Sequence, residues 1–187
     1  MLILASGSPR RAEILGFLDI PFEIITPKGE EKTPEGIAPS EQCVILARQK
    51  ANEIFKTLPD DIVIAADTIV VYDSQIYGKP RNVSEALNML RALSGKTHSV
   101  FTGVCIKSAK KETRFYEESL VEFYQLSEDE MENYVKSGEP FDKAGGYGIQ
   151  GKGATMIKKI NGDYYNVMGL PVSCLRKLKK LIVSNIL

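Results

Sequence analysis

The stretch Ile62-Val63-Ile64-Ala65-Ala66-Asp67-Thr68-Ile69-Val70-Val71-Tyr72 decides how this chain is organised. It is almost continuously apolar and rich in β-branched residues, which predicts a strand covered on both faces in the middle of a sheet. Asp67 and Thr68 interrupt it. A carboxylate in such a strand costs on the order of 3–5 kcal/mol unless a cation, a metal ion or hydrogen bonds compensate it.

Asp67 has two interpretations. It is either part of a functional site, or a structural acid bonded to backbone amides at a β-bulge or at a break between two shorter strands. The functional interpretation is favoured because intact strands seldom carry a carboxylate at their centre.

Size and composition bound the class of protein. The 187 residues allow a large core, and we expect a single domain over residues 1–187. Lysine plus arginine total 24, as do aspartate plus glutamate, so the formal net charge is zero. This balance argues against a bulk nucleic-acid binder, and no run is long and apolar enough for a membrane span. Three widely spaced cysteines without C-x-x-C spacing predict buried thiols, no zinc site and a reducing, cytoplasmic location; they are Cys43, Cys105 and Cys174.

An anion site is predicted near the beginning of the chain. A strand over residues 2–5 is followed by Ser6-Gly7-Ser8-Pro9 and then by a helix to about residue 18. Ser8 suits the N-cap and Pro9 the first helical position. A strand, a glycine-containing turn and a helix N-terminus together present backbone amides and a positive dipole to an anion.

Arg10 and Arg11 in the first turn of this helix strengthen the prediction. Cations there oppose the helix dipole, and an anion between them would relieve that opposition. The alternative is a pair of solvated arginines on a surface helix.

The remaining elements follow from periodicity and capping. We expect a strand over 22–26, helices over 40–57, 82–95, 127–138 and 172–182, a turn over 75–80 and a hairpin of strands 97–108 and 113–125. Lys50 flanks the apolar stripe of the helix over 40–57, where it either snorkels to solvent or reaches into a cleft, and sequence leaves both open. The single histidine, His98, is expected to be structural.

The segment 141–153 is the densest in glycine and is predicted to be a binding loop, to which Lys143 and Gln150 contribute polar groups. Gly146, Gly148 and Gly151 fit G-x-G-x-x-G by spacing, and the phosphate-loop pattern is nearly met. No strand precedes them, and residues 154–160 predict a strand in place of the required helix, so both patterns are weak.

Five motifs, taken together, resemble the Maf family of house-cleaning nucleoside triphosphate pyrophosphatases, which is related in fold to the inosine triphosphate pyrophosphatases. They cover essentially the whole chain in order: Leu4-Ala5-Ser6-Gly7-Ser8-Pro9-Arg10-Arg11, Ala65-Ala66-Asp67-Thr68, Gly78-Lys79-Pro80, Asp142-Lys143-Ala144-Gly145-Gly146-Tyr147-Gly148-Ile149-Gln150-Gly151 and Gly169-Leu170-Pro171.

The resemblance implies an α/β fold with an elongated, twisted mixed sheet, flanking helices and two lobes around a deep cleft, usually in a homodimer. It implies hydrolysis of a nucleoside triphosphate to the monophosphate and pyrophosphate with Mg²⁺ or Mn²⁺. Ser-Pro-Arg-Arg resembles the branch that acts on dTTP and UTP, and Arg11, Thr68 and Gln150 stand at the positions linked to that preference.

Roles follow from the resemblance and from the residue types. Asp67, Glu31 and Lys79 are the expected catalytic residues, and Asp67 and Glu31 the expected metal ligands, with Glu31 favoured over its neighbour Glu30. The expected substrate-binding residues are Ser6, Arg10, Arg11, Lys50, Thr68, Lys143 and Gln150. Asp67 is expected to activate or position the attacking water while cations bind the phosphates. Whether it acts as a base, as a metal ligand or as both stays open.

Two other functions compete with this one. A nucleotide-responsive regulator of cell division would bind without turnover, as the family's older name, septum formation inhibitor, suggests. A phosphate-loop NTPase would release orthophosphate. The water-activating carboxylate favours an enzyme over a pure sensor.

Overall fold

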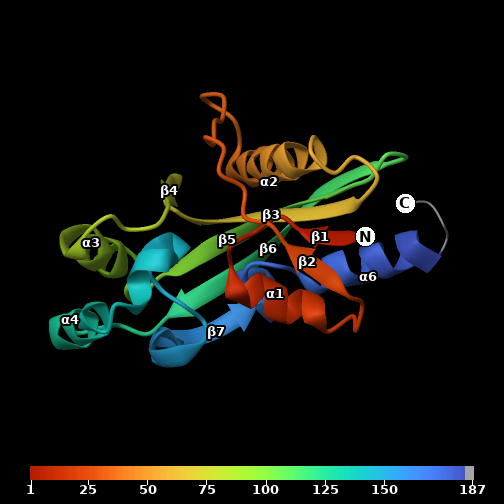
Figure 1. Ribbon diagram of the computed structural model, residues 1–187. Helices are drawn as coiled ribbons and strands as arrows, with labels where there is room; N and C mark the ends of the chain where they lie inside the picture. Colours follow the sequence, from red (N-terminus) through yellow and green to blue (C-terminus); the bar gives the residue numbers. More distant parts are fainter. Residues whose placement is uncertain (184–187) are drawn as a thin grey trace. The chain divides into compact units, whose positions relative to one another are not determined.

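The structure is a computed structural model in which residues 1–183 are described (Figure 1). The elements in chain order are β1 (Leu2–Leu4), α1 (Pro9–Gly16), β2 (Phe22–Ile24), α2 (Pro39–Phe55), β3 (Ile62–Tyr72), β4 (Gln75–Tyr77), α3 (Val83–Leu93), β5 (Thr97–Lys107), β6 (Glu112–Phe123), α4 (Glu128–Lys136), the 3₁₀ helices η1 (Glu139–Asp142), η2 (Ala144–Gly146) and η3 (Gly151–Met156), β7 (Ile157–Asn161), α5 (Tyr164–Met168) and α6 (Val172–Val183).

The described strands form one seven-stranded mixed sheet. Its order is β2-β1-β3-β5-β6-β7, and β4 pairs with β3 outside this order. β1 is parallel to both neighbours, with Leu2 opposite Phe22 on one side and Ile62 on the other. β4 is antiparallel to β3, and β7 to β6. The predicted mixed α/β sheet with flanking helices is therefore confirmed.

By its internal contacts the chain divides into two compact units. Unit 1 comprises Met1–Asp67, Thr102–Glu117 and the chain from Gly169 onward, and unit 2 comprises Thr68–Phe101 and Glu118–Met168. Three strands, β3, β5 and β6, contribute residues to both units. The division within β3 falls between Asp67 and Thr68, the two polar residues that interrupt its apolar sequence.

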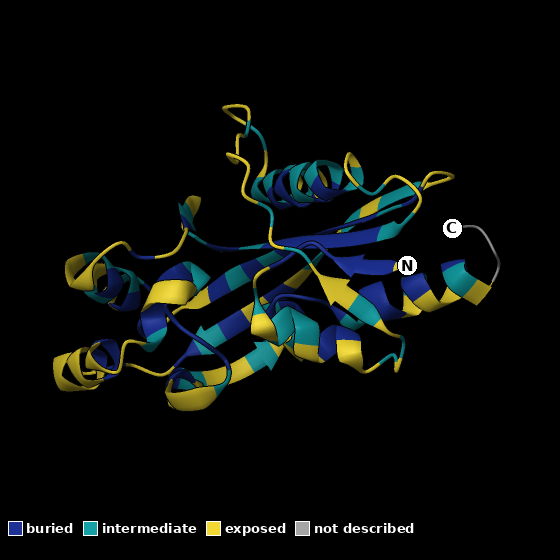
Figure 2. Ribbon diagram, viewed as in Figure 1, coloured by how far each residue is buried: buried dark blue, intermediate teal, exposed yellow. Residues whose placement is uncertain are grey.

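In unit 1, α2 covers one face of the sheet and α1 and α6 cover the other (Figure 1). Ala47 and Ala51 of α2 pack on Ile3, Val63 and Ala65 in one buried cluster. Small side chains on the helix let it lie close to the strands. Figure 2 shows β1 and the first half of β3 as buried, which agrees with the strand buried on both faces that the sequence predicts.

The backbone of α2 comes very close to the sheet at Gly103 of β5. A Cβ atom at this position would lie 2.3 Å from the carbonyl carbon of Cys43 and 2.4 Å from the backbone nitrogen of Val44. Both atoms belong to the backbone of α2, so a side chain is excluded here. Gly103 therefore sets how near the helix lies to the sheet.

In unit 2, α3 and α4 contribute to a second buried core. Leu90 and Leu93 of α3 and Met131 of α4 lie in one cluster with Phe123 of β6 and Tyr147. α4, expected over 127–138, begins with a capping box, because the Ser127 side chain accepts from the Glu130 amide and the Glu130 side chain accepts from the Ser127 amide.

Four local predictions differ from the structure. Residues 75–77, expected in a turn, form β4, because backbone pairing with Val70–Tyr72 of β3 extends the sheet there. Residues 154–156, expected in a strand, belong to η3. Ser8 occupies the N-cap of α1, but its side chain makes no capping bond. The strand expected over 22–26 is shorter, since β2 covers only Phe22–Ile24.

His98 is structural, as expected. It is 2% exposed, its Nε2 lies 2.7 Å from the Tyr147 hydroxyl, and its ring packs edge-on against Phe123 and Tyr147. Its Nδ1 has no hydrogen-bond partner among the described residues. Burial lowers the pKa of His98 from 6.5 to about 4, since the charged imidazolium loses its hydration.

This burial makes stability depend on pH. The depressed pKa means that the unfolded chain binds a proton at higher pH than the folded protein, so stability falls as the pH drops below 6.5 towards 4. Between pH 7 and pH 5 the histidine is expected to remove about 2 kcal/mol from the free energy of unfolding. Urea unfolding of the natural protein and of His98→Phe at both pH values measures this. An equal pH dependence in the two proteins would contradict it.

No helix within residues 1–183 combines the length and the apolar character that a membrane crossing requires.

Candidate active site

Asp67 lies on the face of β3 that α2 covers. Side chains alternate along a strand, so Asp67 shares its face with Val63 and Ala65, both of which pack against α2. The residue is 8% exposed. β3 is continuous through this position, so the predicted alternative of a break between two shorter strands is wrong. The partner of the Asp67 carboxylate must therefore come from α2, which covers this face of β3.

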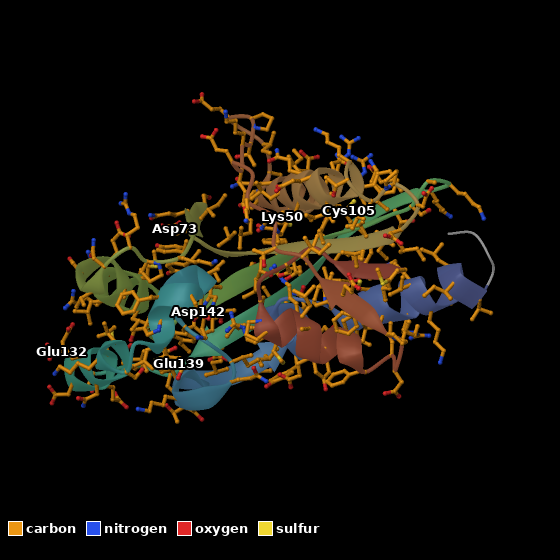
Figure 3. All side chains as sticks on the ribbon, in the orientation of Figure 1. Lys50, Asp73, Cys105, Glu132, Glu139 and Asp142 are labelled. Atoms are coloured by element: carbon orange, nitrogen blue, oxygen red, sulfur yellow. The ribbon has the colours of Figure 1, made fainter. Side chains whose placement is uncertain are left out.

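That partner is Lys50 of α2. Its Nζ lies 2.5 Å from Oδ1 of Asp67 and 3.0 Å from Oε1 of Glu31. The Lys50 side chain is only 16% exposed, and Figure 3 shows it on the side of α2 that faces β3. The sequence leaves open whether Lys50 extends to solvent or into a cleft. In the structure its side chain points inward, towards Asp67. Two carboxylates that are 36 residues apart in sequence converge on one ammonium group.

Ser6 and Arg11 form a second group in unit 1. The Ser6 hydroxyl, in a residue 5% exposed, accepts from the Ser8 amide at 3.1 Å and from Nη1 of Arg11 at 3.3 Å. Nε of Arg11 donates to the carbonyl of Gly169 at 2.8 Å. The motif at the start of the chain and the Gly169-Leu170-Pro171 motif are therefore joined by one guanidinium.

Arg11 belongs to the same electrostatic environment as the acids. Burial lowers its pKa, while the negative charges of Asp67 and Glu31 act in the opposite direction. The positive charge of the half-buried Arg10 next to it lowers the pKa further. Two adjacent, partly buried cations at a helix N-terminus create a positive site that would stabilise a bound anion.

Unit 1 contains a cavity of about 740 Å³ next to Glu31 and Lys50. The segment 29–32 forms one wall and α2 forms another, and Lys107 of β5 completes the lining. Glu31 and Lys50 both line it, so two of the predicted site residues face open space of a size typical of small-molecule sites.

The other predicted site residues belong to unit 2. Thr68 follows Asp67 on β3 and points to the opposite face of the strand. Lys79 is exposed between β4 and α3. Gln150 is half-buried at the N-cap of η3. The Lys143 ammonium contacts its own loop, at 2.7 Å from the Glu139 carbonyl and 2.5 Å from Oδ1 of Asp142.

Within unit 2 the Gly78-Lys79-Pro80 turn and the glycine-rich segment lie side by side. The amide of Gly145 donates to the carbonyl of Gly78 at 3.0 Å. Gly145 has φ +71°, and a Cβ there would lie 2.9 Å from the Val70 side chain, so this position requires glycine. Segment 144–156 contains only the short 3₁₀ helices η2 and η3, which removes both the dinucleotide and the phosphate-loop interpretations.

Three residues that hold the loops around these groups have no recognisable spacing signal in the sequence pattern. Glu139 accepts from the amides of Lys152 and Gly153 and from the Tyr134 hydroxyl, and so fixes the end of the glycine-rich segment. Gln49 and Glu53 of α2 bond to the backbone of segment 28–32. A contact between a side chain and a backbone group distant in sequence produces no recognisable spacing of residue types in the sequence. The one available signal is Glu53 itself, an acid in the last turn of a helix, where the dipole disfavours it.

The donor set of unit 1 is suited to a hard divalent cation. Glu31 and Asp67 offer carboxylate oxygens at a common point, and Mg²⁺ is usually held by one or two carboxylates together with substrate phosphates and water. No cluster of three or more His, Cys, Asp or Glu residues suited to a metal occurs within residues 1–183.

Comparison with known proteins places this geometry in context. A family model described as Maf-like protein matches residues 1–181. The dTTP/UTP pyrophosphatase of Bacillus cereus is 52% identical over 184 residues, which cover 98% of this chain and 96% of that protein. Those of Bacillus mycoides and Bacillus cytotoxicus are 52% and 50% identical, and each alignment covers at least 95% of this chain and 94% of the relative.

Among solved structures, that of the Staphylococcus aureus Ham1 protein aligns with a TM-score of 0.42 and 14% identity, over 65% of this chain and 71% of that one. This likeness is too weak to support a conclusion. The family model and the relatives confirm the resemblance that the five motifs carry, and this chain belongs to the Maf-like protein family.

Proposed function

We propose that this protein hydrolyses dTTP and UTP to the nucleoside monophosphate and pyrophosphate. The observation that carries the proposal is the convergence of Asp67 and Glu31 on Lys50, with the partly buried guanidinium of Arg11 in the same electrostatic environment. Relatives about half identical over nearly their full length are dTTP/UTP pyrophosphatases, which supports both the reaction and the bases.

The positively charged residues of the site are assigned to binding the triphosphate. A triphosphate carries roughly four negative charges near neutral pH, and several cations are needed to bind it. In unit 1 these contacts are assigned to the Ser6 hydroxyl and to the cations Arg10, Arg11 and Lys50. Lys79 and Lys143, both in unit 2, stay predicted site residues. Lys50 also holds the Asp67 carboxylate in one orientation through the ion pair at 2.5 Å.

Asp67 acts on the attacking water. Its carboxylate orients the water towards the α-phosphorus and takes up the proton as the new oxygen–phosphorus bond forms. The bond between the α-phosphorus and the bridging oxygen breaks, and the pyrophosphate leaves with the electron pair. Burial strengthens this arrangement, because a dry site magnifies each electrostatic contact.

Glu31 and Asp67 are the residues that would hold Mg²⁺ or Mn²⁺, since both are hard oxygen donors and face a common point. When bound, such an ion neutralises charge on the phosphates and on the leaving pyrophosphate. Lys50, like the two arginines, is assigned to binding the phosphate chain.

Gln150 and Thr68 are assigned to the base. Gln150 offers one carbonyl and one amide, the complement of the O4 and N3–H edge of uracil or thymine. A site built on such bonds rejects bases that leave its polar groups unpaired. We expect Gln150→Ala to reduce the preference for dTTP and UTP over other nucleotides by about tenfold or more, with a smaller effect on turnover. Steady-state kinetics on all the common triphosphates measures this, and an equal loss on every nucleotide would count against the assignment.

Pyrophosphate release from a panel of canonical and modified triphosphates, with Mg²⁺ or Mn²⁺, tests the proposed reaction. Pyrophosphate as product with dTTP and UTP as preferred substrates is the expected result. Orthophosphate as the product would contradict the proposed reaction, and tight binding without turnover would indicate a regulator. Homodimerisation, which the resemblance implies, is a separate prediction that analytical ultracentrifugation measures.

A further inference from the structure

Residues 28–32, here called the acidic loop, have no regular secondary structure, and all five are exposed. The loop carries Glu31, whose side chain is 47% exposed and is paired with Lys50. A half-exposed ion pair on a long side chain is worth little, on the order of 1 kcal/mol or less, and cannot by itself hold a loop in place. Something else must fix the backbone that carries Glu31.

Glu53 of α2 fixes the first end of the acidic loop. Its Oε1 accepts from the amide of Lys28 at 2.7 Å, and its Oε2 accepts from the amide of Gly29 at 2.9 Å. Both oxygens of one carboxylate are therefore used on consecutive amides, in charge-assisted bonds stronger than those between neutral groups. A Cβ at Gly29 would lie 2.7 Å from Oε2, so glycine lets the carboxylate come this close.

Gln49 fixes the other end of the loop. Its Oε1 accepts from the amide of Lys32 at 3.0 Å, and its Nε2 donates to the carbonyl of the same residue. The side-chain amide thus satisfies both backbone groups of one residue. Gln49 and Glu53 are four residues apart, on one face of α2, and Lys50 follows Gln49 directly.

The position of Glu53 also needs an explanation, and the loop provides it. Glu53 lies in the last turn of α2, which contains no basic residue. The negative end of the helix dipole disfavours a carboxylate there. The two loop amides compensate the unfavourable placement, so the residue serves the loop and not the helix.

We propose that Gln49 and Glu53 are positioning residues that clamp the acidic loop at both ends, so that Glu31 is presented to Lys50 and Asp67 in the geometry required for binding the divalent cation. The inference rests on the proposed function only through the role of Glu31. The clamp itself is a property of the chain without metal or nucleotide and can be measured as such.

Hydrogen–deuterium exchange on the full-length protein without nucleotide or metal tests the clamp. The amides of Lys28, Gly29 and Lys32 are expected to exchange about tenfold faster or more in Glu53→Ala and Gln49→Ala, because each variant removes bonds to those amides. Gly29→Ala should act in the same direction from the loop side, since its methyl group displaces the Glu53 carboxylate. Unchanged exchange over residues 28–32 in the Gln49→Ala/Glu53→Ala double variant would overturn the clamp.

The second measurement is the Mg²⁺ concentration that gives half-maximal dTTP hydrolysis. Residues that orient metal ligands typically change metal affinity or activity by about 10–100-fold when removed, and we expect an increase in this range for Glu53→Ala, with a smaller change in kcat at saturating Mg²⁺. Glu53→Gln keeps one carbonyl acceptor and should be intermediate. Glu53→Asp keeps the charge but is a methylene shorter, so it should resemble Glu53→Ala if contact matters and wild type if charge alone matters. Wild-type behaviour of Glu53→Asp would overturn the contact argument.

Glu41→Ala is the matched control, because Glu41 is an exposed acid on the same helix, ~18 Å from Glu53 along the axis. It should leave both exchange and metal dependence unchanged. Faster exchange in Glu53→Ala with an unaltered Mg²⁺ dependence would overturn the positioning role. A Glu31→Gln variant with natural Mg²⁺ dependence would contradict the proposed role of Glu31 instead, and the exchange data would still report on the clamp.

Discussion

Replacing Asp67 by Asn is expected to lower kcat for dTTP by about 10²–10⁴-fold with the fold intact, if this carboxylate is the general base. Asparagine has nearly the same shape and keeps one oxygen that accepts from Lys50, but it cannot take up a proton. Lys50 retains its ion pair with Glu31, so the substitution leaves no unpaired charge in the interior. Pyrophosphate release under saturating dTTP measures the loss, and circular dichroism with thermal unfolding checks the fold.

The control for this variant is Asp60→Asn. Asp60 is an exposed acid two residues before β3, so it carries the same chemical change without the buried environment. It should turn over dTTP at the natural rate. If Asp67→Asn is also close to natural turnover, Asp67 is not the general base, and its ion pair with Lys50 is structural.

Replacing Gly103 by Ala is expected to destabilise the protein by about 3 kcal/mol or more. The added methyl group would lie 2.3–2.4 Å from backbone atoms of Cys43 and Val44, and backbone of a packed helix cannot move aside as a flexible side chain can. The helix that must shift also carries Lys50, Gln49 and Glu53, so the activity that remains should fall as well. Urea unfolding at 25 °C gives the free energy directly.

Gly16→Ala is the companion variant. Gly16 ends α1, its added Cβ would meet no atom within 4 Å, and its backbone is not in the left-handed region. Alanine there should be neutral or slightly stabilising, by up to about 1 kcal/mol, because it favours the helix. If the free energy of unfolding of Gly103→Ala is within about 1 kcal/mol of that of the natural protein, α2 can move away from the sheet at little cost, and the prediction is wrong.

The sequence predicted the framework well because most elements have strong local signals. Apolar periodicity and caps predict α2, α3, α4 and α6 to within about two residues, and the β-branched run predicts β3. β4 was missed because three residues before Gly78-Lys79-Pro80 have no pattern of their own and become a strand only by pairing with β3. The glycine-dense segment 141–153 is the one that stands out in the sequence. A close backbone contact with α2 is found instead at the isolated Gly103, and a glycine inside a strand is a known signal of such an approach.

Site residues could be predicted from the sequence where a charged side chain stands in an unfavourable environment. Asp67 in an apolar strand and two arginines at a helix N-terminus are both costly, so each indicates a compensating partner. The identity of the partner was not predictable for Lys50, because a lysine on the flank of a helix has the same pattern whether it faces solvent or a carboxylate. Gln49 and Glu53 were missed for a related reason, since their partners are backbone groups about 20 residues earlier, to which any residue type contributes.

The three buried cysteines have a practical consequence. Burial raises the pKa of each thiol to about 12, so almost no thiolate exists at neutral pH and maleimide reagents should leave the natural protein unmodified. A spin label or fluorophore can therefore be attached at one introduced cysteine without first deleting the natural ones. Lys32, whose side chain is 74% exposed although its backbone is held by Gln49, offers an attachment point from which spectroscopy can follow the acidic loop in solution.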